Sequence, residues 1–225
     1  MSKYSSVFDI VGPSMIGPSS SHTAGAAKIG LMARNIFNAQ PQNVQIILYG
    51  SFAKTYKGHG TDLALIGGLL GYSADDRRIV NSAQDALRLG ININLTTSDE
   101  ETDHPNTAKI IMNRDNRTFE IVGISPGGGR AEIVEINGFK VKAAADNNFL
   151  LVFHHDRYGV IAAVANLLAS HGINIGHMEV ARKSKGAEAL MVIQTDQQVP
   201  DDITIELKEL AHVTGIVAFN KNSGR

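Results

Sequence analysis

The order of apolar segments after residue 148 is the feature that most constrains the fold of this chain. Their periodicities predict strands over 149–153, 173–182, 187–195 and 213–219, and helices over 157–170 and 201–210. The resulting order is βαββαβ, which is typical of the ferredoxin-like split βαβ motif. We therefore predict a ferredoxin-like domain over residues 148–225.

The first 146 residues predict a separate domain of mixed helices and strands. Helices are expected over 24–37, 62–70 and 82–89, strands over 44–49 and 91–95, three further strands within 108–137, and a loop over 50–61. Gly67 and Gly68 fall inside a predicted helix, where glycine is costly, so we expect another backbone to pack closely there. The polar stretch 145–148 predicts the domain boundary, giving an α+β protein with domains 1–146 and 148–225.

Composition excludes several classes of function. The formal net charge of -1 and the lack of a basic block argue against a nucleic-acid surface. The chain has no cysteine, which excludes disulfides, a cysteine nucleophile and any thiolate-ligated metal held by this chain alone. No apolar run approaches a membrane span, and no signal peptide is evident at the N-terminus. A cytoplasmic protein without a membrane partner is the expectation.

Four hydroxyls and an imidazole stand together directly before the first predicted helix. They belong to Ser19, Ser20, Ser21, His22 and Thr23. A helix start carries unpaired N–H groups and a partial positive charge, which suits a small anion such as a carboxylate. The alternative is an N-cap in a serine-rich turn, for which one hydroxyl would suffice. The spacing alone leaves both interpretations open.

Two further polar loops contain histidine. The first carries His59, Gly60, Thr61 and Asp62, and the second carries His104, Asn106 and Thr107 around a proline. Each has a plain structural alternative, a satisfied histidine beside a helix cap or an ordinary turn. Because sites concentrate in loops on a rigid scaffold, three such loops together favour a functional role. The glycine-rich stretch 126–129 lacks phosphate-loop spacing and predicts a hairpin connection.

The segments GPSSSHTAG, KGHGTD and HPNT together resemble the β subunit of the iron–sulfur-dependent L-serine dehydratases. The resemblance covers residues 4–222, because the βαββαβ unit resembles an ACT domain. The first domain is also similar to the substrate-sensing domain of some D-3-phosphoglycerate dehydrogenases. A non-catalytic regulatory module that binds serine or a related small acid is therefore the alternative function.

The resemblance implies a lyase that converts L-serine to pyruvate and ammonia. In the family, a [4Fe–4S] cluster binds the serine 3-hydroxyl through one iron that acts as a Lewis acid. Since this chain has no cysteine, the resemblance implies a separate, cysteine-bearing α subunit that ligates the cluster, and no metal ligand in this chain. Pyridoxal phosphate is not expected, because Lys54 and Lys57 lack a phosphate loop.

The resemblance also assigns site residues. It implies catalytic roles for His22, His59, His104 and Asn106, and substrate-binding roles for Ser19, Ser20, Ser21, Thr23, Gly60, Thr61, Asp62 and Thr107. Residues 19–23 are expected to hold the substrate carboxylate, with His22 charged near pH 7. Asp62 would either position His59 or cap its helix, and the cap is favoured.

In the ACT unit, the resemblance places an effector site at His154, Asp156 and Asn174, with the asparagine supplied by a paired domain. Asp156 stands where serine-binding relatives have asparagine, and its charge disfavours a nearby carboxylate. Self-association through the ACT domain is the alternative role, and it is the one we favour.

Overall fold

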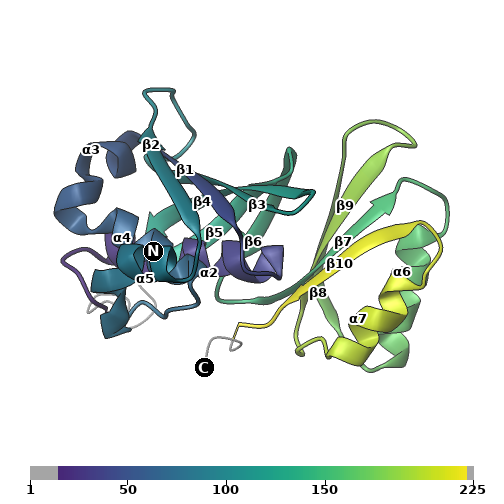
Figure 1. Ribbon diagram of the computed structural model, residues 1–225. Helices are drawn as coiled ribbons and strands as arrows, with labels where there is room; N and C mark the ends of the chain where they lie inside the picture. Colours follow the sequence, from purple (N-terminus) through teal and green to yellow (C-terminus); the bar gives the residue numbers. More distant parts are fainter. Residues whose placement is uncertain (1–14, 222–225) are drawn as a thin grey trace, which may run out of the picture. The chain divides into compact units, whose positions relative to one another are not determined.

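The computed structural model describes residues 15–221, so residues 1–14 and 222–225 of the two predicted domains lie outside the described part (Figure 1). Contacts divide the chain into two units between Asn137 and Gly138. This division comes earlier than the predicted boundary at 145–148. The cause is strand β6 (Phe139–Ala144), which the sequence did not predict and which contacts β8 and β9.

The first unit is built on a mixed sheet in which its strands have the order β2-β1-β3-β4-β5. These strands are β1 (Asn43–Tyr49), β2 (Asn92–Thr97), β3 (Asn106–Arg114), β4 (Arg117–Gly127) and β5 (Arg130–Ile136). β1 pairs parallel with β2 and antiparallel with β3. Side chains alternate between the faces of a strand, and every second residue of β1 and β4 is buried. One face of the sheet therefore carries the core.

Helices cover that apolar face. The short π-helix η1 (Ser20–Gly25) leads into α2 (Ala26–Phe37), which contacts β3, β4 and β5, and α4 (Thr61–Leu69) packs on α2 (Figure 1). η2 (Arg77–Asn81) and α5 (Ser82–Arg88) follow. The prediction of three strands within 108–137 is confirmed.

The predicted loop over 50–61 is wrong, because α3 (Gly50–His59) forms there. The glycines and lysines of this segment are typical of a loop. Only one residue of the helix, Phe52, is fully buried. Gly50 has a φ of 53°, so the chain turns from β1 directly into the helix without a loop. Tertiary burial of one aromatic ring has outweighed weak local propensity.

The close backbone approach expected at the helical glycines is confirmed at Gly68. A Cβ there would overlap the carbonyl oxygen of Ala27 and lie 2.6 Å from the backbone nitrogen of Leu31. Gly30 on α2 faces the same contact, since its Cβ would overlap the carbonyl oxygen of Leu65. Two glycines thus allow α2 and α4 to touch backbone to backbone.

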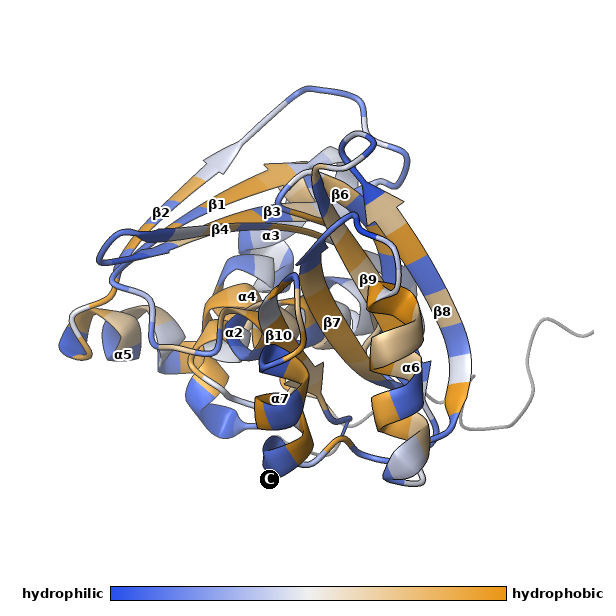
Figure 2. Cartoon of the chain, turned by 90° about the vertical axis from the view of Figure 1, so that its right-hand side faces the viewer, coloured by the Kyte–Doolittle hydropathy of each residue, from blue (hydrophilic) through white to orange (hydrophobic). Residues whose placement is uncertain are grey.

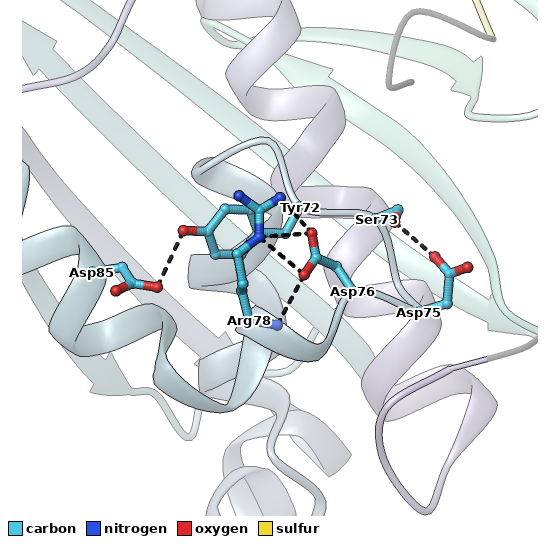
Figure 3. A network of polar contacts seen from close by, with 6 residues as sticks. All are labelled: Tyr72, Ser73, Asp75, Asp76, Arg78 and Asp85. Atoms are coloured by element: carbon cyan, nitrogen blue, oxygen red, sulfur yellow. Dashed lines mark hydrogen bonds and ion pairs between the residues drawn. The ribbon is translucent and has the colours of Figure 1, made fainter.

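A polar network orders the connection between α4 and α5 (Figure 3). The guanidinium of Arg78 lies 4.2 Å from the ring centre of Tyr72 and binds both carboxylate oxygens of Asp76. The Tyr72 hydroxyl donates to Asp85 at 3.1 Å. The same connection accepts a backbone hydrogen bond of 2.9 Å from Ile16. It therefore supports the segment that leads into the serine-rich motif.

The second unit confirms the predicted βαββαβ order. It contains β7 (Asn148–His155), α6 (Val160–Ser170), β8 (Ile175–Arg182), β9 (Glu188–Thr195), α7 (Asp201–Lys208) and β10 (Val213–Phe219). The antiparallel sheet has the order β10-β7-β9-β8, and β7 and β9 are apolar over most of their length (Figure 2). Leu150, Val164 and Leu168 are fully buried in its core. No helix within residues 15–221 is long and apolar enough to cross a membrane.

Replacement of Gly68 by alanine should destabilise the first unit. The added Cβ meets backbone that cannot move like a flexible side chain, and overpacking of this kind costs about 1–3 kcal/mol. Gly58→Ala is the matched control, because Gly58 is also helical and a Cβ there meets nothing within 4 Å. Urea denaturation should show a lower free energy of unfolding for Gly68→Ala only. Equal stability of the two variants would contradict the close contact.

Candidate functional site

The three polar motifs meet at the start of α3. The Oγ of Ser51, in the first turn of this helix, lies 3.0 Å from Nε2 of His22 in the first motif. Its backbone N–H donates to the carbonyl of Pro105 in the third motif at 2.6 Å. The helix then runs to His59 in the second motif. Residues far apart in the sequence are therefore joined through one serine.

In the first motif, the hydroxyls surround His22. Ser19 is the N-cap of η1 and accepts the backbone N–H of His22 at 3.2 Å, so the capping interpretation holds for this residue. The same hydroxyl and that of Ser21 lie 3.3 and 3.1 Å from Nδ1 of His22. Thr23 donates its hydroxyl to the carbonyl of His59 at 3.2 Å. Capping thus accounts for the hydroxyl of Ser19, while the hydroxyl of Ser21 contacts the histidine and that of Thr23 binds the second motif.

His22 is held against two aromatic rings. Its ring centre lies 4.8 Å from that of His59 and 5.2 Å from that of Phe52, both edge to face. Burial, and secondly the nearby His59, lower the pKa of His22 below its usual value of 6.5. The imidazole of the isolated chain is therefore mainly neutral at pH 7, which corrects the expectation of a charged His22.

Two buried polar atoms lie at the turn between α3 and α4. Nδ1 of His59 and Oγ1 of Thr61 are buried without a hydrogen-bond partner among the described residues. Gly60 makes the turn with a φ of 64°, and Asp62 accepts the backbone N–H of Leu63 at 2.9 Å. Asp62 lies in the first turn of α4, and the N-cap is Gly60 without a side-chain capping bond, so Asp62 is not the cap that was favoured. Buried polar groups usually have partners, so His59 and Thr61 are candidates for contact with a bound molecule.

In the third motif, His104 is fixed by its own loop. Its Nδ1 accepts the backbone N–H of Asn106 at 3.1 Å, which places the ring proton on Nε2. Its carbonyl accepts the hydroxyls of Thr102 and Thr107, so Thr107 stabilises the loop. The amide of Asn106 donates to the carbonyl of Ser125 on β4 at 3.1 Å. The loop is thereby anchored to the sheet.

Sequence reasoning missed Ser51 and Ser125. Ser125 is fully buried, donates its hydroxyl to the carbonyl of Arg130 at 3.2 Å, and packs on Gly25, where a Cβ would overlap its Oγ. Ser51 was hidden by the incorrect loop prediction. The available signal was the glycine that directly follows a buried strand, since it indicates a strand-to-helix turn with a serine at its start.

A groove of about 640 Å³ lies between α3, α4, α5 and β2. Its walls are mainly apolar, and of the predicted site residues only Asp62 lines it. The hydrogen-bonded cluster around His22 is a separate feature that rests on specific contacts of polar groups. We therefore place the candidate site at that cluster. The described residues contain no group of three histidine, cysteine or acidic side chains suited to a metal ion.

The predicted effector residues do not meet within one chain. Asp156 binds Arg182, which is the last residue of β8, and the backbone of Gly186. Asn174 precedes β8 and binds Asp196 at the opposite end of that strand. His154 is buried, and its Nε2 has no hydrogen-bond partner within residues 15–221, while Nδ1 lies 2.9 Å from the His155 carbonyl.

Comparison with known proteins identifies the two domains of this chain. The family model described as "Serine dehydratase beta chain" matches residues 6–129, and the ACT domain model matches residues 149–212. The chain is thus a serine dehydratase β-type domain followed by an ACT domain.

Two curated relatives extend over nearly the whole chain. The chain is 52% identical to the probable L-serine dehydratase β chain of Bacillus subtilis, over 94% of this chain and 96% of that protein. It is 38% identical to the L-serine dehydratase β chain of Peptoniphilus asaccharolyticus, over 88% and 90% of the two lengths. The D-3-phosphoglycerate dehydrogenase of Bacillus subtilis is 32% identical, over 86% of this chain and 36% of that enzyme. The chain belongs to the L-serine dehydratase β-chain family.

The titration of His22 provides a direct check on this geometry. We expect a midpoint below 6.5 by NMR, and His59→Gln should raise it only in part, because burial is the larger cause. Since the unfolded chain binds the proton more readily, the stability that His22 contributes is present above about pH 6.5 and is lost as pH falls through the lowered pKa. A midpoint at or above 6.5 in the folded chain would contradict the buried, neutral imidazole.

Proposed function

We propose that this chain forms the substrate-binding half of an L-serine ammonia-lyase, which converts L-serine to pyruvate and ammonia together with a separate α subunit. The observation that carries the proposal is the junction at Ser51, which joins the three motifs around His22. Two buried polar atoms on the second of these motifs, Nδ1 of His59 and Oγ1 of Thr61, have no hydrogen-bond partner in the described part of the chain. Membership of the β-chain family supports L-serine as the substrate.

The residues of this chain do not fit an iron–sulfur cluster. There is no cysteine in the sequence, and the described residues contain no suitable group of histidine or acidic ligands. In this proposal the [4Fe–4S] cluster belongs to the α subunit, whose cysteines ligate it. The part played by the present chain is therefore derived from binding and orientation alone.

L-Serine presents a carboxylate, an ammonium group and a hydroxyl. The site offers uncharged hydrogen-bonding groups for them. The hydroxyls of Ser20 and Ser21 donate hydrogen bonds to the carboxylate without a formal charge, and the neutral His22 orients the Ser21 hydroxyl. Nε2–H of His104 and the amide of Asn106 are further hydrogen-bonding groups for substrate or for the departing water. Nδ1 of His59 and the Thr61 hydroxyl are polar groups available to the ammonium or hydroxyl.

The overall reaction requires loss of the α-proton and the 3-hydroxyl, which leave together as water. The aminoacrylate that remains tautomerises to an imine, and hydrolysis of the imine gives pyruvate and ammonia. In this scheme the β chain orients serine so that its hydroxyl faces the α subunit. Orientation of this kind supplies much of an enzyme's rate enhancement.

For the ACT unit we propose self-association with a second copy of this chain. Strand β8 is an edge strand, and its Val180 is 40% exposed. Tyr158 and Ile161, which are also exposed, lie at the start of α6. A second candidate is effector binding, favoured by the partnerless Nε2 of His154; Asn174 would then come from the paired copy.

Activity of the reconstituted pair tests the enzymatic proposal. Anaerobic co-expression with the cysteine-bearing chain should give a complex that forms pyruvate from L-serine. His22→Ala or Asn106→Ala should reduce kcat/KM by at least about 100-fold, because the first removes the ring that orients the Ser21 hydroxyl and the second removes a group proposed to touch substrate. His171→Ala, on the surface of the ACT unit, is the control and should retain activity. A cluster-loaded pair without pyruvate formation would overturn the enzymatic proposal, and full activity of both variants would overturn the site.

Sedimentation of the full chain tests the role of the ACT unit. We expect self-association that Val180→Asp weakens, because a charge on an edge strand opposes strand-to-strand pairing. Leu87→Asp, at an exposed leucine of α5, is the control. Serine-dependent tightening that His154→Ala removes and His155→Ala preserves would establish the effector role. A monomer at all concentrations would contradict self-association.

A further inference from the structure

We propose that Ser51 is a positioning residue that fixes the tautomer and the orientation of His22 for the reaction. This inference rests on the proposed function of the site. No sequence motif assigned a role to Ser51, which lies in the segment predicted to be a loop.

The position of Ser51 is set from two directions. Its N–H donates to the Pro105 carbonyl at 2.6 Å, and its carbonyl accepts the hydroxyl of Thr55 at 2.9 Å. Gly50, directly before it, has no room for a side chain, because a Cβ would lie 2.6 Å from the same Pro105 oxygen. The Ser51 hydroxyl is therefore presented from a backbone that the third motif holds in place.

The hydroxyl selects one form of the imidazole. Nε2 of His22 is the only hydrogen-bond partner of the Ser51 hydroxyl among residues 15–221, and in this proposal the hydroxyl donates to an unprotonated Nε2. The ring proton then lies on Nδ1, which is within 3.1 Å of the Ser21 hydroxyl. Ser21 in turn is 3.4 Å from Ser19, so a chain of hydroxyls continues from the ring proton. The opposite tautomer would leave the Ser51 proton without an acceptor in the described protein.

The arrangement ties His22 to the third motif. A shift of the Pro105 carbonyl moves the Ser51 backbone, and with it the only group of the described protein that is hydrogen-bonded to Nε2. At metal sites, removal of a group that orients a ligating histidine typically costs about 10–100-fold in affinity or activity, and we expect a loss of similar size here. Ser51 thus couples the position of the third motif to the protonation pattern of the first.

The test uses Ser51→Ala, Ser51→Thr and Ser170→Ala. Ser170 lies on α6 and donates its hydroxyl to the carbonyl of Leu167, so its alanine variant is a matched serine-to-alanine control. Side-chain ¹⁵N NMR of the full chain should show His22 protonated on Nδ1 in the wild type and in Ser170→Ala. Ser51→Ala should lose this single-tautomer signature while its backbone amide spectrum remains that of a folded chain, and Ser51→Thr, which keeps the hydroxyl, should retain it.

Kinetics of the anaerobic pair provide the second readout. Ser51→Ala should lower kcat/KM for L-serine about 10–100-fold, and Ser51→Thr should recover most of the loss. An unchanged His22 tautomer in Ser51→Ala overturns the inference, whatever the activity. A changed tautomer with unchanged activity shows that Ser51 fixes the ring and overturns the proposed role of His22 in the reaction. The failure of the inference and the failure of the proposed function therefore give different results.

Discussion

A side chain at residue 50 would collide with Pro105, and this constraint determines how the rest of the site assembles. Because Gly50 adopts a φ of 53° and lacks a Cβ, β1 passes directly into α3 while the loop that carries His104 and Asn106 lies against the first turn. The N–H of Ser51 then meets the Pro105 carbonyl, and its hydroxyl meets His22. Three segments that are distant in the sequence become one polar cluster through this single turn.

The electrostatics of the cluster follow from its burial. A histidine that is removed from water and placed beside another histidine loses affinity for its proton, so His22 acts as a neutral, oriented hydrogen-bonding group. The serines around it set where the ring proton lies. A fixed network of neutral groups binds a zwitterion such as serine without burying a net charge of its own, and buried charge without a partner is costly.

The sequence predicts regular elements well where one periodicity dominates. The whole βαββαβ unit and the three strands within 108–137 followed from alternation and helical spacing. The close approach at Gly68 followed from the cost of glycine in a helix. Helix α3 could not be predicted in this way, since its only deeply buried residue is Phe52 and its glycines and lysines indicate a loop. β6 was missed because its short alternating segment lies next to the polar stretch taken as the domain boundary.

Only part of the candidate site could be predicted, because the sequence shows clusters of polar residues but not the contacts between them. Clusters of histidine and hydroxyl residues indicated three candidate segments, and the structure brings these segments together around His22. They do not show which backbone groups join those segments, so Ser51 and Ser125 became visible only in three dimensions. The charge of His22 was mispredicted because burial cannot be judged from a serine-rich turn.

The central claim is that separate motifs serve one site, and a double-mutant cycle tests it most directly. The quantity to measure is kcat/KM for L-serine in the anaerobic pair, with His22→Gln, Asn106→Asp and the double variant. The account predicts a double variant little worse than the more impaired single variant, because residues that act as a unit have strongly non-additive effects. Losses that simply multiply would show that the two motifs act independently and would contradict a single shared site.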